Sequence, residues 1–585
     1  MEENLKLNKK RSFGEVMRGR KARILPTILV SIIIPFILCI SVPFEIYCNN
    51  SSEFVFGILD FLPFCLAFCV GIASALIILL LLLPNTAYKI CLYLFFGLGF
   101  MFFLQGTYLN GNLSLAGDNM SSGGVSKVSI YINLGVWVLL IAGFIALALS
   151  IKDKKGYIRL GTIVLSVIVL ATQVMSITFS CINNKDAFVS PEMRNSSDNA
   201  VNNEVPLTTK NLTNISTSKN IFYFVIDRFD ETYAESAYIS DSSIYDKLEG
   251  FTWFKDNISI YGHTFPAVCN MLTGAEHKGN LYREPYLEDA YNNDNPLKEL
   301  SENGYDINLY TTMYYSYTGK NMPSYISNLE AGEYSVDNSF GLSFRMVELS
   351  LFRCVPLIAK WAFKDINSST CNSYATFTSD GEINYQSSNS SAYNLVDIKG
   401  FQKTDKKQFT FIHVDGTHKP ESDLSSKKYT IPSVENALKN SFRIINKYID
   451  ELKANDLYKD ATIIITGDHG YSKNDLTKLT TAVQTALFVK PAGVESGVLK
   501  QSTAQTSHAD IWATIHSSIG LESRFNVGKN VFDISETELR TRYYIWQTYQ
   551  SGSMDEFIYK ITGNGSEFNN WHEEAVTHYN KDVMQ

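Results

Sequence analysis

The sequence predicts a protein of two parts: an N-terminal five-helix transmembrane bundle and an external α/β domain, whose mostly parallel sheet is sandwiched by helices. Five long stretches without a charged side chain lie before residue 185 of the 585-residue chain. Beyond them, two continuous apolar runs, 221–226 and 461–466, each lead within two residues to an aspartate. Such runs are typical of strands buried on both faces, as in a parallel sheet.

The five uncharged stretches are each long enough to cross a membrane. They run over residues 24–44, 61–84, 90–115, 128–151 and 160–184. A helix needs about 20 apolar residues to span ~30 Å of hydrocarbon. Buried core helices of a soluble protein are the alternative, which five successive stretches disfavour. A cleaved signal peptide is disfavoured because the basic region is long and no clear small-residue cleavage site follows it.

The basic residues predict how the bundle is oriented. Eight precede the first span, and others follow the second and fourth spans: Lys6, Lys9, Lys10, Arg11, Arg18, Arg20, Lys21 and Arg23, then Lys89, then Lys152, Lys154, Lys155 and Arg159. The other loops carry Glu45, Glu53, Asp60 and Asp118, with Lys127 as the one base. Since positive loops stay in the cytoplasm, we expect a multi-pass plasma-membrane protein with a cytoplasmic N-terminus and an extracellular domain.

The spans are expected to act as an anchor. Their interiors contain no ionisable side chain, which disfavours an ion pump or a proton relay. The net charge of −8 is slightly acidic, and the basic residues gather at the predicted cytoplasmic loops. Both observations argue against a nucleic-acid partner.

Composition divides the chain into five segments. They are a basic cytoplasmic segment at 1–23, the transmembrane region at 24–184, an Asn-, Ser- and Thr-rich linker at 185–218, the external domain at 219–535 and a C-terminal extension at 536–585. Further strands are expected at 307–311, 408–414 and 486–490, and an amphipathic helix at 433–458. For Cys354 and Cys371, a disulfide and two buried thiols are both open.

Two aspartates and a histidine fall at the ends of the two apolar runs. Asp227 follows the first run, and Asp468 and His469 follow the second, between two glycines. In parallel sheets, ligands bind beyond the carboxyl ends of the strands. Carboxylate oxygens and an imidazole nitrogen suit Zn²⁺ or Mn²⁺. With the hydroxyl of Thr264, they predict a metal site of Asp227, Thr264, Asp468 and His469.

Thr264 opens the segment Thr-Phe-Pro-Ala-Val-Cys-Asn-Met-Leu-Thr-Gly, which predicts the start of a helix. Pro266 suits a first helical turn, because its missing N–H would have no partner there. Thr264 then lies near the N-cap, where backbone N–H groups and the helix dipole attract a phosphate or sulfate ester. Two interpretations are open: a nucleophile that a metal ionises, or an ordinary N-cap threonine.

A strand ending at Asp227, a helix start at Thr264 and a strand followed by Asp468 and His469 occur in this order in the chain. Over about residues 219–535 this order resembles the alkaline phosphatase superfamily, which includes type I sulfatases, phosphodiesterases and lipid-headgroup transferases. In that family the first strand ends in an acidic metal ligand, which matches Asp227. The nucleophile precedes a Leu-Thr-Gly, which matches Thr264, and a later Asp-His-Gly supplies ligands, which matches Asp468 and His469. The resemblance implies a sulfatase-like fold with one divalent metal, Zn or Mn; Mg, Ca or an added second metal are the alternatives.

The resemblance also implies which atom is attacked. Type I sulfatases carry a Cys, converted to formylglycine, where this chain has Thr264, so a phosphorus centre with a Thr nucleophile is favoured over a sulfate ester. The segment Gly416-Thr-His-Lys-Pro resembles the family's Gly-x-His-x-Pro. This match implies that His418 binds phosphoryl oxygens or protonates the leaving group. A second metal held by Asp415, His418 and His508 is an open alternative.

Five spans followed by such a domain are similar to lipoteichoic acid synthases and phosphoethanolamine transferases. The similarity implies an enzyme that transfers a phospholipid headgroup, of phosphoglycerol or phosphoethanolamine type, from a membrane lipid to an envelope glycan or glycolipid through phospho-Thr264. A sulfatase-like hydrolase or phosphodiesterase and a non-catalytic membrane scaffold are the alternatives. One departure is that lipoteichoic acid synthases use Glu as the first ligand, where this chain has Asp227.

Overall fold

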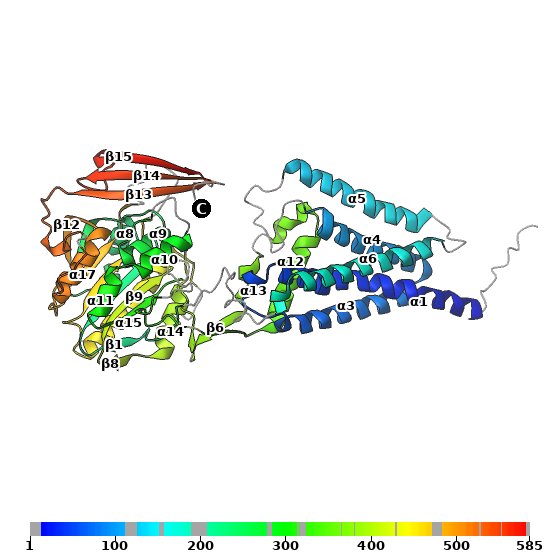
Figure 1. Ribbon diagram of the computed structural model, residues 1–585, viewed down its shortest axis with the longest axis horizontal. Helices are drawn as coiled ribbons and strands as arrows, with labels where there is room; N and C mark the ends of the chain where they lie inside the picture. Colours follow the sequence, from blue (N-terminus) through cyan, green and yellow to red (C-terminus); the bar gives the residue numbers. More distant parts are fainter. Residues whose placement is uncertain are drawn as a thin grey trace, which may run out of the picture. The chain divides into compact units, whose positions relative to one another are not determined.

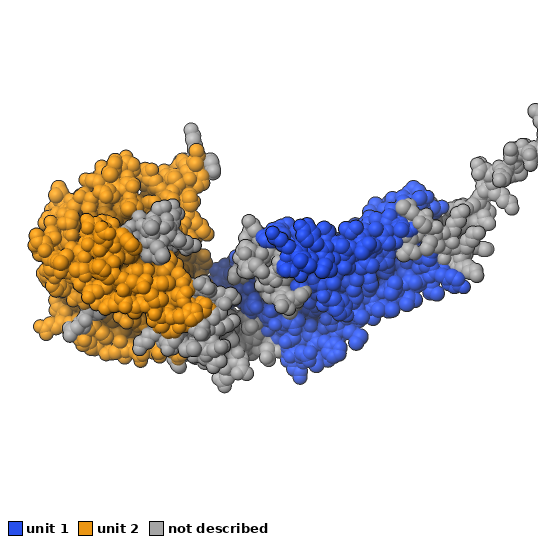
Figure 2. All heavy atoms as spheres, turned by 90° about the horizontal axis from the view of Figure 1, so that it is seen from above, with its two compact units in different colours: residues 1–202, 333–377 blue, residues 203–332, 378–585 orange. Residues whose placement is uncertain are grey.

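The computed structural model shows two compact units, coloured separately in Figure 2. Residues 1–202 with 333–377 form one, which we call the helical unit, and residues 203–332 with 378–585 form the other, the sheet unit. The structure describes residues 13–110, 126–150, 157–188, 207–277, 283–312, 315, 323–330, 332–363, 366–379, 381–426, 430–470, 483–525, 528–550 and 553–580.

The helical unit consists mainly of long apolar helices (Figure 1). They are α1 (Phe13–Phe36), continued through a π-helical turn (Ile37–Ser41) into α2 (Val42–Asn49), then α3 (Leu62–Leu82), α4 (Asn85–Tyr108), α5 (Lys127–Ser150) and α6 (Tyr157–Asn183). Five helical stretches are long and apolar enough to cross a bilayer, which confirms the five predicted spans. The charged residues Lys6, Lys9, Lys10, Arg11, Asp118, Lys152, Lys154 and Lys155 lie outside the described residues, and the orientation stays a prediction.

Helix α6 buries polar side chains and exposes apolar ones, which is the reverse of the pattern in a helix of a water-soluble protein. Its buried side chains are largely polar: Thr162, Ser166, Val169, Gln173 and Ser180. Many of its exposed side chains are apolar: Val164, Leu165, Val167, Ile168, Val174, Met175, Phe179 and Ile182. Exposing so many apolar groups to water is unfavourable, whereas small and polar groups commonly join helices within a bilayer. The helix is therefore suited to a membrane.

One acidic residue lies within a span rather than in a loop. Glu45, expected in the loop after the first span, belongs to α2 and to the continuous helix Ala22–Asn49. Its carboxylate lies 2.5 Å from Ser176 Oγ of α6 and 3.6 Å from Arg353 Nη2. The first span therefore continues past the predicted end at residue 44, and an ion pair and a hydroxyl replace water around this carboxylate.

The sheet unit is built on seven strands. Their order is β12 (Lys500–Ser507), β3 (Thr252–Ile258), β11 (Leu487–Lys490), β10 (Thr462–Thr466), β2 (Asn220–Ile226), β9 (Lys407–Val414) and β4 (Tyr305–Tyr310). β11 runs antiparallel to both of its neighbours, and every other pairing in this sheet is parallel. The mostly parallel sheet predicted from the apolar runs is confirmed.

Helices cover both faces of this sheet, because its central strands carry apolar side chains on each side. On one face α15 (Val434–Ala454) packs Tyr448 against Phe222, with ring centroids 5.3 Å apart. On the other, α17 (Ile511–Ile519) stacks Trp512 on Phe409, with centroids 5.7 Å apart. Helices α9 (Thr264–Thr273) and α10 (Arg283–Asn292) contribute to this second core. Two apolar cores therefore hold the strands rigidly beneath their carboxyl ends.

Two segments were not anticipated by the domain boundaries. The C-terminal residues form an antiparallel sheet of β13 (Thr541–Gln550), β14 (Ser553–Thr562) and β15 (Trp571–Asn580). Residues 333–377, inside the predicted domain 219–535, belong to the helical unit; they include α12 (Ser339–Cys354), the short helix η8 (Leu357–Phe363) and α13 (Ser368–Asn372). Cys354 and Cys371 are both free, buried thiols, so the disulfide alternative is not realised.

Candidate functional site

Three neighbouring strands bring the predicted residues to one edge of the sheet. Strands β10, β2 and β9 lie side by side and parallel, so their carboxyl ends meet at the same edge. Asp227 directly follows β2, and Asp468 and His469 follow β10 after a single glycine. The turn that contains His418 follows β9. The fold thus gathers groups that are far apart in the sequence.

Two glycines let the three loops lie against one another. A Cβ on Gly467 would lie 2.5 Å from the carbonyl oxygen of Phe229, and one on Gly416 would lie 2.7 Å from the backbone nitrogen of Asp227. Only a residue without a side chain permits such approaches. The hydroxyl of Thr417 then donates to the Asp227 carbonyl at 3.0 Å. Each glycine is therefore required by the loop that follows β2.

Thr264 points into the site instead of capping its helix. Phe265, which precedes a proline and so avoids helical dihedrals, has φ −99° and ψ 124°, and the regular helix begins only after it. The residue at the N-cap position of α9 is His263, whose side chain makes no cap hydrogen bond. Thr264 Oγ1 lies 3.2 Å from His469 Nε2. The hydroxyl therefore faces the candidate metal ligands, as the nucleophile interpretation expects.

A lone pair of His469 faces the Thr264 hydroxyl. Its Nδ1 lies 2.6 Å from the carbonyl oxygen of Gly470. A carbonyl only accepts hydrogen bonds, so Nδ1 carries the proton and Nε2 presents a free lone pair. This is the arrangement that metal-binding histidines commonly have. Thr264 Oγ1 lies within hydrogen-bond distance of His469 Nε2.

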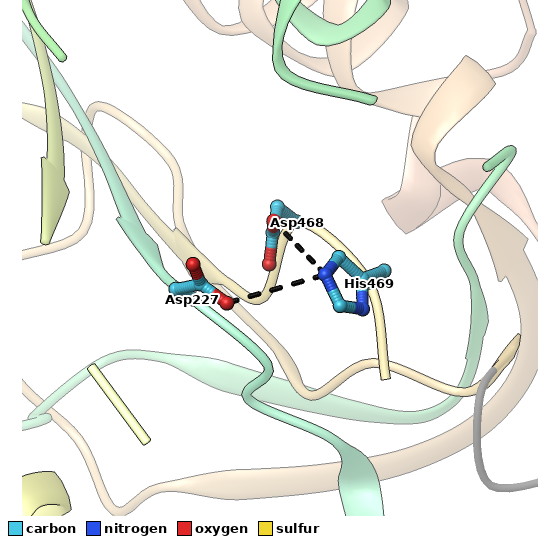
Figure 3. A group of neighbouring side chains, drawn as sticks. All are labelled: Asp227, Asp468 and His469. Atoms are coloured by element: carbon cyan, nitrogen blue, oxygen red, sulfur yellow. Dashed lines mark ion pairs between the residues drawn. The ribbon is translucent and has the colours of Figure 1, made fainter. Parts of the chain in front are cut away.

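The two carboxylates complete the cluster (Figure 3). Asp227 Oδ1 lies 4.0 Å and Asp468 Oδ2 3.5 Å from His469 Nε2, and one ligand atom from each of the three residues lies within 4.8 Å of the others. Among the described residues, these two oxygens have no hydrogen-bond partner although both are buried. Asp468 Oδ1 accepts from the backbone N–H of Arg228 at 2.9 Å, which fixes its orientation. The orphaned oxygens fit a divalent cation.

The pKa shifts of Asp227 and Asp468 indicate that a nearby positive charge would stabilise the two carboxylates. Burial, followed by the charges of Asp468 and Asp415, raises the pKa of Asp227 well above its usual value. Burial opposes ionisation of Asp468 as well, but the charges of His469 and His413 and hydrogen bonds from the Arg228 N–H and the Thr264 hydroxyl hold its pKa below its usual value. Two adjacent carboxylates therefore do not both ionise easily without a cation.

His418 lies at the rim of the site. It is exposed, and its backbone N–H donates to the Asp415 carbonyl at 3.0 Å, which closes the turn after β9. Partial burial, then the positive charges of Arg228 and Lys419, lower the pKa of the imidazole. The ring is thus mainly neutral at neutral pH, and a bound anion would favour its protonated form.

The residues suggested for a second metal do not come together. Within the described ranges, the cluster of metal-ligand type consists of Asp227, Asp468 and His469. Asp415 instead accepts from Ser387 Oγ at 2.6 Å. His508 is buried with Nε2 3.1 Å from Thr485 Oγ1, and burial lowers its pKa to about 4. The described geometry therefore favours one metal over two.

Strand β13 lies beside the segment that leads to Thr264, which the sequence did not reveal. The backbone N–H of Ile545 donates to the Ile260 carbonyl at 2.7 Å, so β13 pairs with the chain segment just before Thr264. The Trp546 ring packs tilted against His263, with ring centroids 4.7 Å apart. The His263 ring lies 6.4 Å from that of His469, and its Nε2 donates to the Gln547 carbonyl at 3.0 Å. The C-terminal sheet therefore fixes the turn before Thr264.

A model of the sulfatase family matches residues 219–521, which is more than half of the 585-residue chain. The chain belongs to the sulfatase family. The match covers the strands that carry Asp227, Asp468 and His469 and ends before β13. No curated protein matches the sequence.

Several solved structures are similar to this sulfatase-family chain at low identity. Ps i-CgsB, solved with k-i-k-neocarrahexaose, is 15% identical, with 61% of this chain and 86% of that chain covered and a TM-score of 0.39. The lipoteichoic acid synthase LtaP from Listeria monocytogenes is 14% identical (62% and 88% covered, TM-score 0.33). The phosphonate monoester hydrolase SpPMH from Silicibacter pomeroyi is 11% identical (62% and 89% covered, TM-score 0.34).

Proposed function

We propose that this sulfatase-family protein is a membrane-anchored, metal-dependent enzyme that transfers a phospholipid headgroup, of phosphoglycerol or phosphoethanolamine type, to an envelope glycan or glycolipid. The observation that carries the proposal is the position of Thr264 Oγ1, 3.2 Å from His469 Nε2 and beside two buried carboxylates. A hydroxyl in this place is a candidate nucleophile of covalent catalysis.

The side chains suit the binding of one divalent cation. Asp227 Oδ1 and Asp468 Oδ2 lack hydrogen-bond partners among the described residues, and His469 presents a lone pair beside them. A Zn²⁺ or Mn²⁺ ion bound there would act as a Lewis acid that makes the Thr264 hydroxyl more acidic and offsets phosphoryl charge. Oxygen and nitrogen donors are compatible with both metals.

The reaction divides into two displacements at phosphorus. In the first, Thr264 Oγ bonds to phosphorus, its proton passes to solvent, and the bond from phosphorus to the diacylglycerol oxygen breaks. His418 protonates that leaving oxygen, since the anion beside it favours the imidazolium. In the second, the acceptor hydroxyl gives its proton to His418 and bonds to phosphorus. The bond to Thr264 Oγ then breaks, and the threonine regains a proton from solvent.

Two features support this choice of substrate. A threonine stands where type I sulfatases have the cysteine that becomes formylglycine, and an alkoxide attacking phosphorus needs no such modification. Five helices able to cross a bilayer belong to the same chain, so a lipid donor is available in the surrounding membrane. If water replaced the acceptor hydroxyl, the same two steps would make a hydrolase, which is the runner-up function.

The test uses the full chain in vesicles with labelled phosphatidylglycerol or phosphatidylethanolamine, an acceptor glycolipid, and Zn²⁺ or Mn²⁺. We expect metal-dependent diacylglycerol release, a label on the acceptor, and a phosphorylated peptide containing Thr264. Thr264→Ala should abolish all three. Thr217→Ala is the matched control, because this exposed hydroxyl contacts only a backbone carbonyl, that of Thr404, at 3.3 Å.

Each other outcome identifies an alternative. Release without labelled acceptor, or activity on soluble phosphodiesters alone, would establish a hydrolase. Activity on aryl sulfates that survives in Thr264→Ala would contradict the proposed nucleophile. Absence of both metal binding and activity on every substrate would favour the non-catalytic scaffold.

A further inference from the structure

The segment 333–377 is an insertion that returns to the transmembrane helices. In the sequence it lies between strands β4 and β9 of the sheet, inside the region that the sulfatase family model matches. In the structure it belongs to the helical unit. The buried side chains Leu342, Met346 and Leu349 of α12 share one apolar cluster with the spans. We call residues 339–363, which comprise α12 and η8, the strap.

Polar contacts fasten the strap across one end of the bundle. Ser343 Oγ donates to the carbonyl of Phe61, just before α3 begins, at 2.8 Å. Arg353 Nε donates to the carbonyl of Gly106, near the end of α4, at 2.9 Å. The N–H of Leu357 donates to Asn133 Oδ1, in the second turn of α5, at 3.0 Å. The strap thus crosses the end at which α3 starts, α4 finishes and α5 starts, and Arg353 satisfies a backbone carbonyl that the last turn of α4 leaves free.

The strap also carries large apolar side chains that are exposed. Phe340, Phe344, Ile358 and Trp361 are 56%, 53%, 47% and 50% exposed. Phe340 and Phe344 lie one turn apart on the same side of α12, next to the start of α3. Ile358 and Trp361 follow Leu357, which is bound to α5. The two pairs of exposed groups therefore lie beside different spans.

One pair directly continues the lipid-facing surface of a span. The ring of Phe340 packs edge-on against Phe64 and Phe68 of α3, at centroid distances of 5.9 and 5.3 Å. Phe64 and Val70 of α3 are themselves 41% and 64% exposed, as lipid-facing residues of a span are. With a rise of about 1.5 Å per residue, Phe68 lies about 9 Å along α3 from its first residue. Phe340 therefore sits near the boundary between headgroups and acyl chains.

We propose that the strap is an interfacial membrane element, with Phe340, Phe344 and Trp361 seated among the phospholipids of the leaflet at that end of the bundle. Aromatic rings concentrate at this depth, and interfacial helices bury one apolar face there. A bilayer surrounds the bundle and so meets both pairs of exposed groups. A second copy of the chain would cover one side only. The insertion thereby gives the catalytic part of the chain an attachment to the lipid surface in addition to the linker.

The test places a photoreactive diazirine side chain at Phe340, Phe344 or Trp361 of the full chain in phosphatidylglycerol–phosphatidylethanolamine vesicles. Leu139 of α5, 74% exposed, is the lipid-facing control, and Ile398 of the sheet unit, 82% exposed, is the control outside the bundle. We expect lipid adducts at the three strap positions within about twofold of those at Leu139, and few at Ile398.

Two results would overturn the proposal. One is a lipid-adduct yield at the strap positions as low as that at Ile398 while Leu139 reacts. The other is adducts to a second copy of the chain in place of lipid. Because no activity is measured, either result is independent of whether the proposed headgroup transfer is correct.

Discussion

Glu231→Gln is expected to stabilise the protein, which is an unusual outcome for a buried substitution. Glu231 begins α8 (Glu231–Ser240), four residues after Asp227, and is 6% exposed. Its Oε2 accepts from Trp253 Nε1 at 2.9 Å, and among the described residues its Oε1 has no hydrogen-bond partner. Burial raises the pKa of this carboxyl to about 9. The folded protein therefore holds Glu231 protonated at neutral pH.

The size of the effect follows from the two pKa values. The unfolded chain loses this proton near 4.5 and the folded chain near 9, so the folded state binds more protons between these values and its stability falls as the pH rises. Up to pH 7 the penalty is about 2.5 × 1.36, or about 3 kcal/mol, and at pH 5 it is about 1 kcal/mol. Glutamine keeps the acceptor for Trp253 and never ionises, so it removes this penalty.

The assay is thermal or denaturant unfolding of the full chain in detergent at pH 5, 6 and 7, followed by tryptophan fluorescence. Glu231→Gln should raise the free energy of unfolding, and its advantage over the unsubstituted chain should grow by about 2 kcal/mol between pH 5 and pH 7. Glu435→Gln is the matched control, a glutamate in the first turn of α15 whose side chain is 48% exposed. An advantage for Glu231→Gln that is the same at every pH, or a loss of stability, would refute the reasoning.

Three further outcomes are expected. Asp468→Asn should weaken Zn²⁺ or Mn²⁺ binding by at least about tenfold in calorimetry, because it removes a charged ligand; unchanged affinity would place the metal elsewhere. His508 is buried with its pKa lowered to about 4, so stability should fall by about 3 kcal/mol as pH drops from 6.5 towards 4, and His508→Gln should flatten this dependence in unfolding experiments. Trp546→Phe should lower turnover, by up to about 100-fold, without changing metal affinity, since Trp546 packs against His263 and not against a proposed metal ligand; equal losses in both would indicate a general folding defect.

The spans and the central strands could be predicted because each signal is local. A span needs only an uncharged stretch of sufficient length, and each of the five predicted stretches overlaps one of the five observed helices, with ends that differ by up to seven residues. The strands β2 and β10 are continuous apolar runs buried on both faces. Length and composition alone distinguish both kinds of element from the rest of the chain.

Other strands could not be predicted because their signal depends on distant partners. β3 contains the charged Lys255 and Asp256, and the buried Asp256 is compensated by Arg542 of β13 at 3.0 Å. β12 is a largely polar octapeptide that pairs with β3. Neither run shows apolar alternation. In each, the tertiary pairing decides the structure.

The candidate site likewise contains residues that could be predicted from local sequence and residues that could not. Asp227, Thr264, Asp468 and His469 could be selected because each stands at the end of a locally recognisable element. The packing of Trp546 against His263 could not, since nothing near Trp546 in the sequence marks it as a neighbour of the segment that carries Thr264. The strap was missed for a similar reason. An amphipathic helix such as α12 reads the same whether its apolar side packs on a sheet or on transmembrane helices.

The buried carboxylates argue that the site is built to hold a cation and is not a remnant of one. Leaving a buried polar atom without a partner costs about 1–3 kcal/mol, and more when the group is charged. Asp227 Oδ1 and Asp468 Oδ2 are both in this situation among the described residues, and the raised pKa of Asp227 expresses the same cost. At Asp227, whose pKa is raised, a scaffold would be more stable with asparagine. A bound divalent cation removes the cost at both, and it does so at the one place where a threonine hydroxyl and a histidine lone pair also point.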